Sequence, residues 1–356
     1  MREESFKFLQ ELVAAPSPSG YEQPAQRVFR AYISPFAEVT QDVMGNVFGG
    51  IRGEGEDLPR VMLVGHSDEI GFQVRYLDDK GFIYFGAIGG VDPHLTPGQR
   101  VHIHGRKGQV IGVIGKKPIH LMEAKDRETV VKLDSQYIDI GASDRKIAEE
   151  LVRVGDPVTF ADSLERLQGD RVTSRGFDDK AGSFVVAEVL RRIAAAAEKP
   201  RLDMYGVSSV QEEVGLRGGT TSSYAVNPDI GICVEVDFAT DQPDVERKHN
   251  GDVALGLGPI LPRGANINPA LFDLLAATAA DENIPVQFTG IPRATGTDAN
   301  VMQISRRGVA TALVKIPLRY MHTPVEVLSL GDLEHAVDLI VALLYRIGDK
   351  KAFIPA

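Results

Sequence analysis

The sequence has one cysteine, a net negative charge and no long apolar run. The single cysteine, Cys233, excludes an internal disulfide framework and a zinc site built from several cysteines. It lies in the apolar run DIGICVEV, so we expect a buried, unreactive thiol. The 39 Lys and Arg residues against 49 Asp and Glu residues give a net charge of -10. This charge argues against a nucleic-acid partner, which needs a basic protein face.

Apolar segments long enough to act as membrane or secretion signals are also missing. No uninterrupted apolar run approaches the ~18–20 residues of a membrane span. The first ten residues, MREESFKFLQ, are charged and lack the apolar segment of a secretory signal. We therefore expect a cytoplasmic protein without a membrane partner. The GxSxG, HExxH and P-loop motifs are absent, which argues against the catalytic centres that they build.

The segments that are present alternate between strand and helix patterns. A length of 356 residues suggests about two domains, at ~150 residues each. Short runs rich in β-branched residues predict strands at 60–65, 203–210, 229–236 and 309–316. Apolar residues at helical spacing predict helices at 3–14, 180–197, 269–281 and from 333 onward. This alternation indicates an α/β fold with a mostly parallel sheet flanked by helices.

Residues 71–167 have a different character. They are dense in short strands and in turn sequences such as LDDKG and GRKGQ, and only 143–151 reads as a helix. We interpret 71–167 as an inserted, β-rich, barrel-like domain. The α/β domain then consists of residues 1–70 and 168–356.

Polar residues of the types that bind metals or transfer protons lie at the ends of the predicted elements. Most of them directly follow a predicted strand, and Asp178 precedes a helix. Because the carboxyl ends of parallel strands share one edge of a sheet, where ligands bind, these side chains can converge. The set is His66, Asp68, Asp178, Glu212, Glu213, Asp237 and His322.

Each member of this set also has an ordinary explanation. His66 and Asp68 suit a polar loop, although a carboxylate beside a histidine is typical of an oriented metal ligand. Asp178 and Asp179 suit a helix cap, but one acid is enough for capping. The pair Glu212-Glu213 suits a solvated loop; alternatively, one acid binds a metal while the other acts as a base.

The combination is more informative than any member. Two histidines and three carboxylates suit two zinc-like ions with one carboxylate bridging them, and one further acid is then free as a base. Glu235 lies inside an apolar strand, where an unpaired buried carboxylate is costly.

Motifs across nearly the whole chain resemble metallopeptidase family forty-two, the co-catalytic aminopeptidases that assemble as tetrahedral (TET) particles. The motifs occur in the family's order: PSPSGYE at 16–22, HSDEIGF at 66–72, FDDKAG at 177–182, QEEVGLRG at 211–218, VDFATD at 236–241, GTDA at 296–299 and RYMHTPVE at 319–326.

The resemblance implies a role for each site residue. One ion is held by His66, Asp178 and Asp237. The second is held by Asp178, Glu213 and His322, so that Asp178 bridges the two. Asp178 is preferred to Asp179 because its spacing to Gly182 matches related enzymes. Glu212 is the general base for a metal-bridging hydroxide, and Asp68 orients His66.

The resemblance extends to cofactors, substrates and assembly. It implies two divalent ions per subunit, zinc or cobalt, and peptide substrates cleaved at the N-terminal residue. It also implies dimers that build a hollow dodecamer through the inserted domain, which controls access.

The segment GIPRATGTDA at 290–299 resembles a substrate-facing loop. Arg293 is a candidate partner for an acidic substrate side chain, because guanidinium matches carboxylate in two hydrogen bonds. Thr297 and Asp298 belong to the same candidate substrate site. The alternative is that Arg293 is a surface residue or bridges subunits.

Two other functional classes stay open at this point. The same metal centre serves a deacylase, a carboxypeptidase or a sugar-directed hydrolase. Alternatively, the chain is a scaffold or assembly protein that has kept the fold without catalysis, although the complete set of ligands and the base argue against this. The preferred N-terminal residue and the native metal also stay open.

Overall fold

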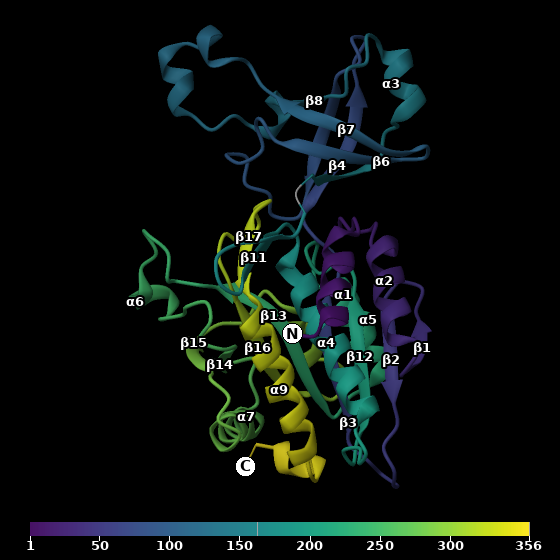
Figure 1. The fold of residues 1–356 in the computed structure, drawn as a ribbon, viewed down its shortest axis with the longest axis vertical. Coiled ribbons are helices and arrows are strands. Elements are labelled where there is room, and N and C mark those ends of the chain that lie inside the picture. The colour runs from purple at the N-terminus through teal and green to yellow at the C-terminus, as the bar shows by residue number, and fades with distance from the viewer. Residues whose placement is uncertain (162, 356) are drawn as a thin grey trace.

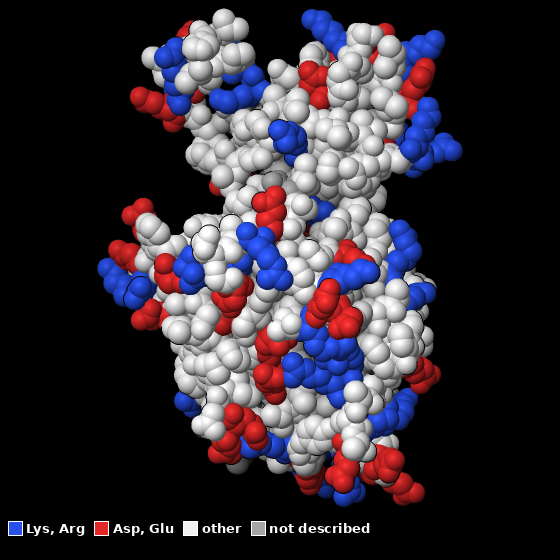
Figure 2. Space-filling view, in the orientation of Figure 1, with Lys and Arg blue, Asp and Glu red and all other residues white. Residues whose placement is uncertain are grey.

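The structure of the chain, a computed structural model, describes residues 1–161 and 163–355. Figure 1 shows two bodies, a lower α/β body that holds both ends of the chain and an upper β-rich body. Figure 2 shows a constriction between them, and acidic and basic side chains are interspersed on the face in view.

The described part of the lower body contains an eight-stranded sheet in the order β1-β2-β12-β3-β13-β16-β14-β15. Its strands are β1 (Glu38–Gln41), β2 (Val47–Ile51), β3 (Arg60–His66), β12 (Asp203–Ser209), β13 (Ile230–Phe238), β14 (Ile260–Gly264), β15 (Gln287–Ile291) and β16 (Ala310–Leu318). The central strands β12, β3, β13 and β16 are parallel, whereas β2 and β14 pair antiparallel with their inner neighbours. The predicted α/β class with a mostly parallel sheet is therefore confirmed.

Helices cover both faces of this sheet (Figure 1). One face packs against α1 (Glu3–Ala14), α2 (Gln23–Ile33), α4 (Phe177–Ala195), α7 (Pro269–Asp281) and α9 (Leu330–Arg346). The other face packs against α5 (Arg217–Val226) and α8 (Asp298–Gln303). Within β3, Val61 and Leu63 join the first core, and Met62 and Val64 join the second. Alternate side chains thus point to opposite faces, as expected for a strand buried on both sides.

The upper body is a closed barrel in the order β4-β5-β8-β7-β6-β9. Its strands are β4 (Gly71–Leu77), β5 (Ile83–Ile88), β6 (Arg100–Gly105), β7 (Gly108–Gly115), β8 (Tyr137–Asp139) and β9 (Pro157–Phe160). The ring of Phe72 meets those of Phe85 and Phe160 edge to face, with centroids 4.9 and 5.2 Å apart. These rings fill a separate apolar core, so the predicted β-rich, barrel-like insertion is confirmed as a fold.

Shorter elements complete the chain. A small sheet joins β10 (Glu165–Arg166), β11 (Arg171–Ser174) and β17 (Glu326–Ser329). The short helices are α3 (Arg145–Leu151), α6 (Arg247–Asn250), η1 (Ile119–Leu121), η2 (Ala124–Glu128), η3 (Leu133–Ser135) and η4 (Lys350–Phe353). None of the described helices is both long enough and apolar enough to cross a bilayer. Cys233 is buried, as expected.

Candidate metal centre

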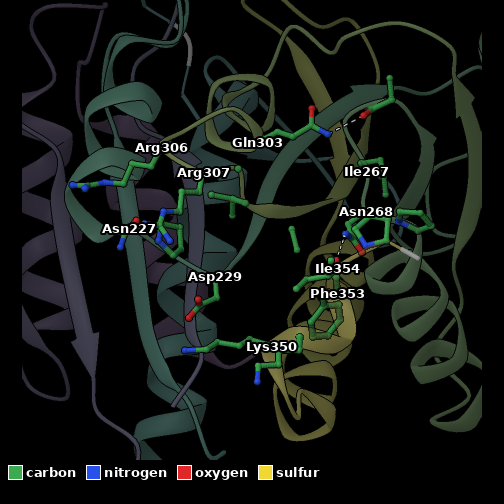
Figure 3. A pocket seen from close by; sticks show the side chains of 18 residues that line it. Asn227, Asp229, Ile267, Asn268, Gln303, Arg306, Arg307, Lys350, Phe353 and Ile354 are labelled. Atoms are coloured by element: carbon green, nitrogen blue, oxygen red, sulfur yellow. Dashed lines mark hydrogen bonds between the residues drawn. The ribbon is translucent and has the colours of Figure 1, made fainter. Parts of the chain in front are cut away.

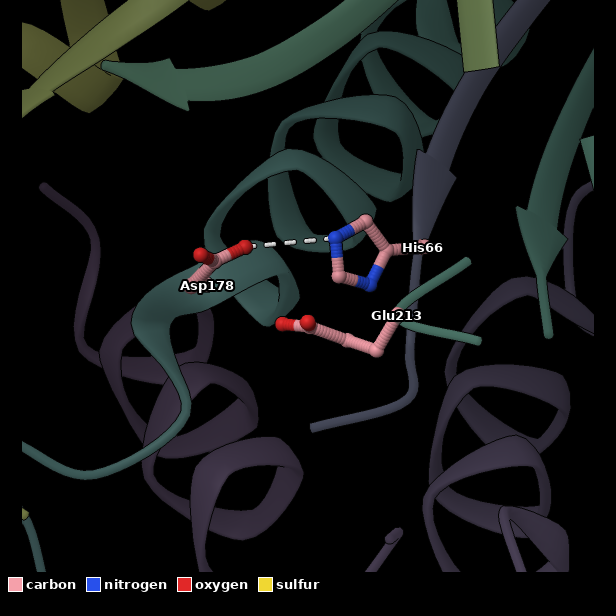
Figure 4. Close-up of side chains that lie close together, drawn as sticks. All are labelled: His66, Asp178 and Glu213. Carbon is pink, nitrogen blue, oxygen red and sulfur yellow. Dashed lines mark ion pairs between the residues drawn. The ribbon is translucent and has the colours of Figure 1, made fainter. Parts of the chain in front are cut away.

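The predicted site residues come together at the carboxyl edge of the parallel strands. His66 is the last residue of β3, and Glu212 and Glu213 follow the end of β12. Asp178 lies in the first turn of α4. Figure 4 shows the side chains of His66, Asp178 and Glu213 pointing toward one another from these elements.

His66 presents one ring nitrogen to several carboxylates. Its Nε2 lies 3.2 Å from Asp178 Oδ1, 3.6 Å from Glu235 Oε1 and 3.9 Å from Glu212 Oε2. Its Nδ1 lies 3.0 Å from the backbone oxygen of Asp68. A carbonyl only accepts, so Nδ1 carries the proton that is donated there. In the neutral ring this leaves the Nε2 lone pair facing the carboxylates, as a metal ligand requires.

The Asp178 carboxylate lies between two histidines. Oδ1 approaches His66, and Oδ2 lies 3.2 Å from His322 Nε2. Glu213 Oε1 lies 3.3 Å from the same His322 nitrogen. The neighbouring Asp179 uses both oxygens on backbone groups, accepting from the N–H of His66 at 3.1 Å and of Gly182 at 3.0 Å. Asp178 is therefore the better placed of the two acids for bridging.

Asp237 is not among the residues that the structure brings together in this cluster, so its role as a ligand stays a prediction that the geometry does not support. Its Oδ2 accepts a hydrogen bond from Lys315 Nζ at 2.9 Å, and its side chain is 22% exposed. β13 continues through Phe238, so Asp237 lies within the strand and not just beyond it. Glu235, two residues earlier on the same face, is buried and approaches His66 instead.

Asp68 does more than orient His66. Its Oδ1 accepts the backbone N–H of Glu212 at 2.9 Å, and its Oδ2 accepts that of Glu213 at 3.1 Å. The Ser19 hydroxyl also donates to Oδ2, at 2.7 Å. This fully buried carboxylate therefore fixes the backbone of the Glu212-Glu213 pair.

Two further buried acids that we did not predict support the same residues. Glu326 accepts the backbone N–H of His322 at 3.0 Å and of Asp178 at 3.2 Å. Glu22 accepts the N–H of Gln211, the residue before Glu212, at 3.2 Å. Both acids occur within quoted motifs, RYMHTPVE and PSPSGYE, and that position was the available signal.

The cluster concentrates negative charge in a buried place. The pKa of Glu212 is raised to about 10, mainly by burial, and the carboxylates of Glu235 and Asp298 contribute to this rise. Burial also raises the pKa of Glu213 and of Glu235. Hydrogen bonds that His322 donates to the carboxylates of Asp178 and Glu213 raise the pKa of His322 to about 11. Such a group of acids favours the binding of positive charge.

The donor atoms suit divalent metal ions. Ligand atoms of His66, Asp178 and Glu213 lie within 4.8 Å of one another, and so do those of His66, Asp179 and Glu235. Imidazole nitrogen with carboxylate oxygen is a common zinc ligand set. The two groups share His66, so this residue is common to both candidate ligand sets.

The predicted substrate segment is divided between exposed and buried residues. Arg293 is exposed, and among the described residues it has no hydrogen-bond or ion-pair partner, so its contact with a substrate stays a prediction. Thr297 is buried and its hydroxyl lies 2.9 Å from that of Thr295. Asp298 is buried and accepts from the Ser209 hydroxyl at 2.6 Å, and burial raises its pKa to about 6.

A separate cavity of about 1050 Å³ lies at the opposite edge of the sheet (Figure 3). Asp229 and Ala310 line it, and they adjoin the starts of β13 and β16. Its rim carries the cationic side chains of Arg306, Arg307 and Lys350. The residues of the metal cluster do not line it, so it does not share the chemistry of the carboxyl edge.

A profile described as M42 glutamyl aminopeptidase matches residues 45–339 of the chain. The chain belongs to the M42 glutamyl aminopeptidase family. The lysyl aminopeptidase of Pyrococcus furiosus is 38% identical over 343 residues, which cover 95% of this chain and 96% of that protein. This M42 protein is thus a peptide hydrolase of the aminopeptidase type, which confirms the predicted family and enzyme class.

Solved structures of TET peptidases are also similar to this M42 chain. A TET aminopeptidase from a marine sediment archaeon of the Thaumarchaeota has a TM-score of 0.93 at 34% identity, covering 99% of this chain and 98% of that one. The TET1 peptidase of Pyrococcus horikoshii, which can assemble into a tetrahedron or a large octahedral shell, has a TM-score of 0.85 at 31% identity. That match covers 96% of this chain and 100% of the TET1 chain.

Proposed function

We propose that this aminopeptidase is a dinuclear metal enzyme that removes N-terminal residues from peptides. The observation that carries the proposal is the Asp178 carboxylate, whose two oxygens each lie 3.2 Å from Nε2 of a different histidine. One carboxylate between two imidazoles is the arrangement that a bridging ligand requires. His66 and His322 come from distant parts of the chain, so the fold builds this arrangement specifically.

The ligand sets follow from the contacts of Asp178. His66, Asp178 and Glu235 would hold one ion, with Glu235 in the place that we had given to Asp237. Asp178, Glu213 and His322 would hold the other. Zinc and cobalt both accept this mixture of imidazole and carboxylate donors.

Glu212 lies beside His66, belongs to neither ligand set and acts as the general base in this proposal. When bound, two divalent ions supply positive charge that polarises the scissile carbonyl and makes a water easier to deprotonate. Glu212 accepts the proton of the attacking water and delivers it to the leaving amine. Asp68 keeps Glu212 in place through the 2.9 Å bond to its backbone N–H.

The excess of carboxylates also suits the substrate's N-terminus. A free α-amine has a pKa of ~7.7–8.0, so near neutral pH it carries positive charge. Buried acids around His66 would hold this amine and place the first peptide bond at the centre. This requirement distinguishes an aminopeptidase from a carboxypeptidase or a deacylase with the same ions.

The inserted domain, residues 71–167, serves assembly and access in this proposal. The similarity to TET peptidases supports a homo-oligomer, with dimers that build a dodecamer. The inserted domain exposes apolar side chains that an interface would cover, among them Ile111, Ile119, Leu121 and Val154. Location in the cytoplasm stays a prediction of the sequence.

The test is to strip the enzyme of metal and reload it with zinc, cobalt or manganese. A panel of amino-acid anilides then measures hydrolysis, with the N-acetylated forms as matched controls. We expect two ions per chain, loss of activity in the stripped enzyme, and cleavage of the free-amine substrates only. Activity that survives metal removal, or equal cleavage of acetylated anilides, would contradict the proposal.

A further inference from the structure

The barrel reaches into the metal centre through the turn after β5. The backbone oxygen of Gly90 lies 3.0 Å from Nδ1 of His322. Gly89 sits beside the other ligand of that ion, since a Cβ there would lie 3.2 Å from Glu213 Oε2. These two glycines are the first residues after Ile88, where β5 ends.

The position of the turn is fixed by the start of the barrel. Ile88 pairs with Gly71, the first residue of β4. A Cβ on Gly89 would lie 2.8 Å from Cγ2 of Ile70, the residue before that strand. The turn therefore packs against the chain just as it leaves the site segment His66–Glu69. A shift of the barrel at this junction would move the Gly90 oxygen.

The orientation of the His322 ring depends more on a contact from another segment of the chain than that of the His66 ring does. The side chain of His66 is 2% exposed and packed on all sides, whereas that of His322 is 34% exposed. The backbone of His322 has a φ of 62°, a region that non-glycine residues rarely adopt, and Glu326 holds its N–H. The ring itself has one backbone acceptor among the described residues, the Gly90 oxygen.

We propose that the Gly89–Gly90 turn is a positioning element of the metal centre, which makes the barrel part of the ligand geometry. The Gly90 carbonyl accepts the Nδ1–H of His322, which fixes the tautomer and turns Nε2 toward Asp178 and Glu213. An acceptor on the far ring nitrogen is what orients a metal-binding histidine. The inference rests on the proposed dinuclear function and assigns the insertion a role beyond assembly and access.

Substitution of Gly90 tests this directly. In Gly90→Ala the new Cβ would lie 3.0 Å from His322 Nδ1 and 3.2 Å from Cε1, so the ring must turn. Gly348→Ala is the matched control, because its Cβ meets no atom within 4 Å and neither glycine has a positive φ. We expect Gly90→Ala to bind one ion ~10–100-fold more weakly in a chelator competition titration. The other ion and the control variant should keep wild-type affinity.

A second pair of variants separates the contact from backbone strain. Gly89→Ala introduces an alanine at a φ of 72° against Glu213, and Gly98→Ala introduces one at 85° with open space around it. Both belong to the connection between β5 and β6, so both carry a similar backbone cost. Weakened binding of one ion in Gly89→Ala but not in Gly98→Ala supports the proposal, and equal effects overturn it.

The outcomes distinguish this inference from the proposed function. A wild-type enzyme that binds fewer than two ions refutes the dinuclear function. A wild type with two ions and a Gly90→Ala variant that binds both equally well, or loses both together, refutes only the role of the turn. A crystal structure of the zinc-loaded wild type is the independent check, because zinc on Nδ1 of His322 would also overturn the proposal.

Discussion

The side chains of Glu235 and Asp237 project from the same face of β13 and yet have different environments. Glu235 is buried near His66, and Asp237 is held by Lys315 at the edge of the cluster. Burial raises the pKa of Glu235, and His66 and, to a smaller extent, Lys315 oppose the rise; Lys315 pairs in register with Glu235 across the two strands. A two-residue step along a strand thus separates an acid that faces His66 from an acid that pairs with a lysine.

Substitution of these two acids tests the proposed assignment of Glu235 as the ligand. We expect Glu235→Gln to lose one ion, because an amide binds a divalent cation much less well than a carboxylate. Asp237→Asn should keep both ions, since its partner is Lys315. Metal analysis of the two purified variants measures the difference. Loss of an ion from Asp237→Asn alone would restore the original prediction.

Glu212 and Glu213 are adjacent in the sequence, but we expect their substitutions to have different effects. We expect Glu212→Gln to lower kcat by ~10²–10⁴-fold while two ions stay bound, because the amide cannot take a proton. Glu213→Gln is the matched control and should lose one ion, since Glu213 faces His322. Metal content and kcat are measured on the same preparations. A loss of metal from Glu212→Gln, with both ions kept in Glu213→Gln, would reverse the two roles.

At the scale of elements, a buried ion network ties α4 to the end of α1. Lys180 Nζ donates to Glu69 Oε1 at 3.0 Å and to the backbone oxygen of Ala15 at 2.8 Å. Arg175 also pairs with Glu69. Burial opposes ionisation of Glu69, but Arg175 and Lys180 lower its pKa to about 2. The first turn of α4, which carries Asp178, therefore depends on charges behind the metal centre.

Removal of the Glu69 charge should destabilise the fold. We expect Glu69→Gln to cost ~3–5 kcal/mol in the free energy of unfolding, because it leaves two buried cations without their carboxylate. Glu149→Gln is the control, since its partner Arg145 is exposed and such pairs contribute ~0–1 kcal/mol. Urea unfolding measures both. Equal, small effects in the two variants would contradict the role of the network.

The same network predicts a pH dependence. The pKa of Glu69 is lowered from 4.5 to about 2, so the folded state binds fewer protons than the unfolded state in this interval. Its stabilisation is fully present above about pH 4.5 and is lost as the pH falls toward 2. The difference between wild type and Glu69→Gln should shrink over that range in unfolding measurements. A difference that stays constant from neutral pH to pH 2 would contradict the shift.

The elements that sequence patterns found are those with strong local signals. α1 and α7 begin and end where helical spacing placed them, and Asn268 caps α7 by accepting from Leu271 N–H. The last two strands on this side of the sheet, β14 and the edge strand β15, were not predicted, because such short strands lack a continuous apolar pattern. Which of Glu235 and Asp237 reaches His66 depends on how far β13 extends past its neighbours. The spacing of residues along the sequence contains no information on how far β13 extends past its neighbouring strands.

At the scale of the whole molecule, the two bodies have separate apolar cores and meet near the metal centre. We expect the protein to sediment as an oligomer with a mass that is a multiple of the single chain. The physical reason is the set of exposed apolar side chains on the barrel, which water does not favour. Analytical ultracentrifugation at micromolar concentration measures this. A fully active monomer would refute the proposed assembly.

The division of the α/β body around its insertion has a consequence for biosynthesis. β3, which ends in His66, leaves the ribosome long before β12 and β13, the strands that pair with it. At ~5–20 residues per second, tens of seconds separate His66 from His322 during translation. The nascent chain can therefore complete the barrel early, but it cannot assemble the clustered acids and histidines until synthesis is nearly finished. The chain therefore lacks an assembled peptide-hydrolase site for most of the time that it is being synthesised.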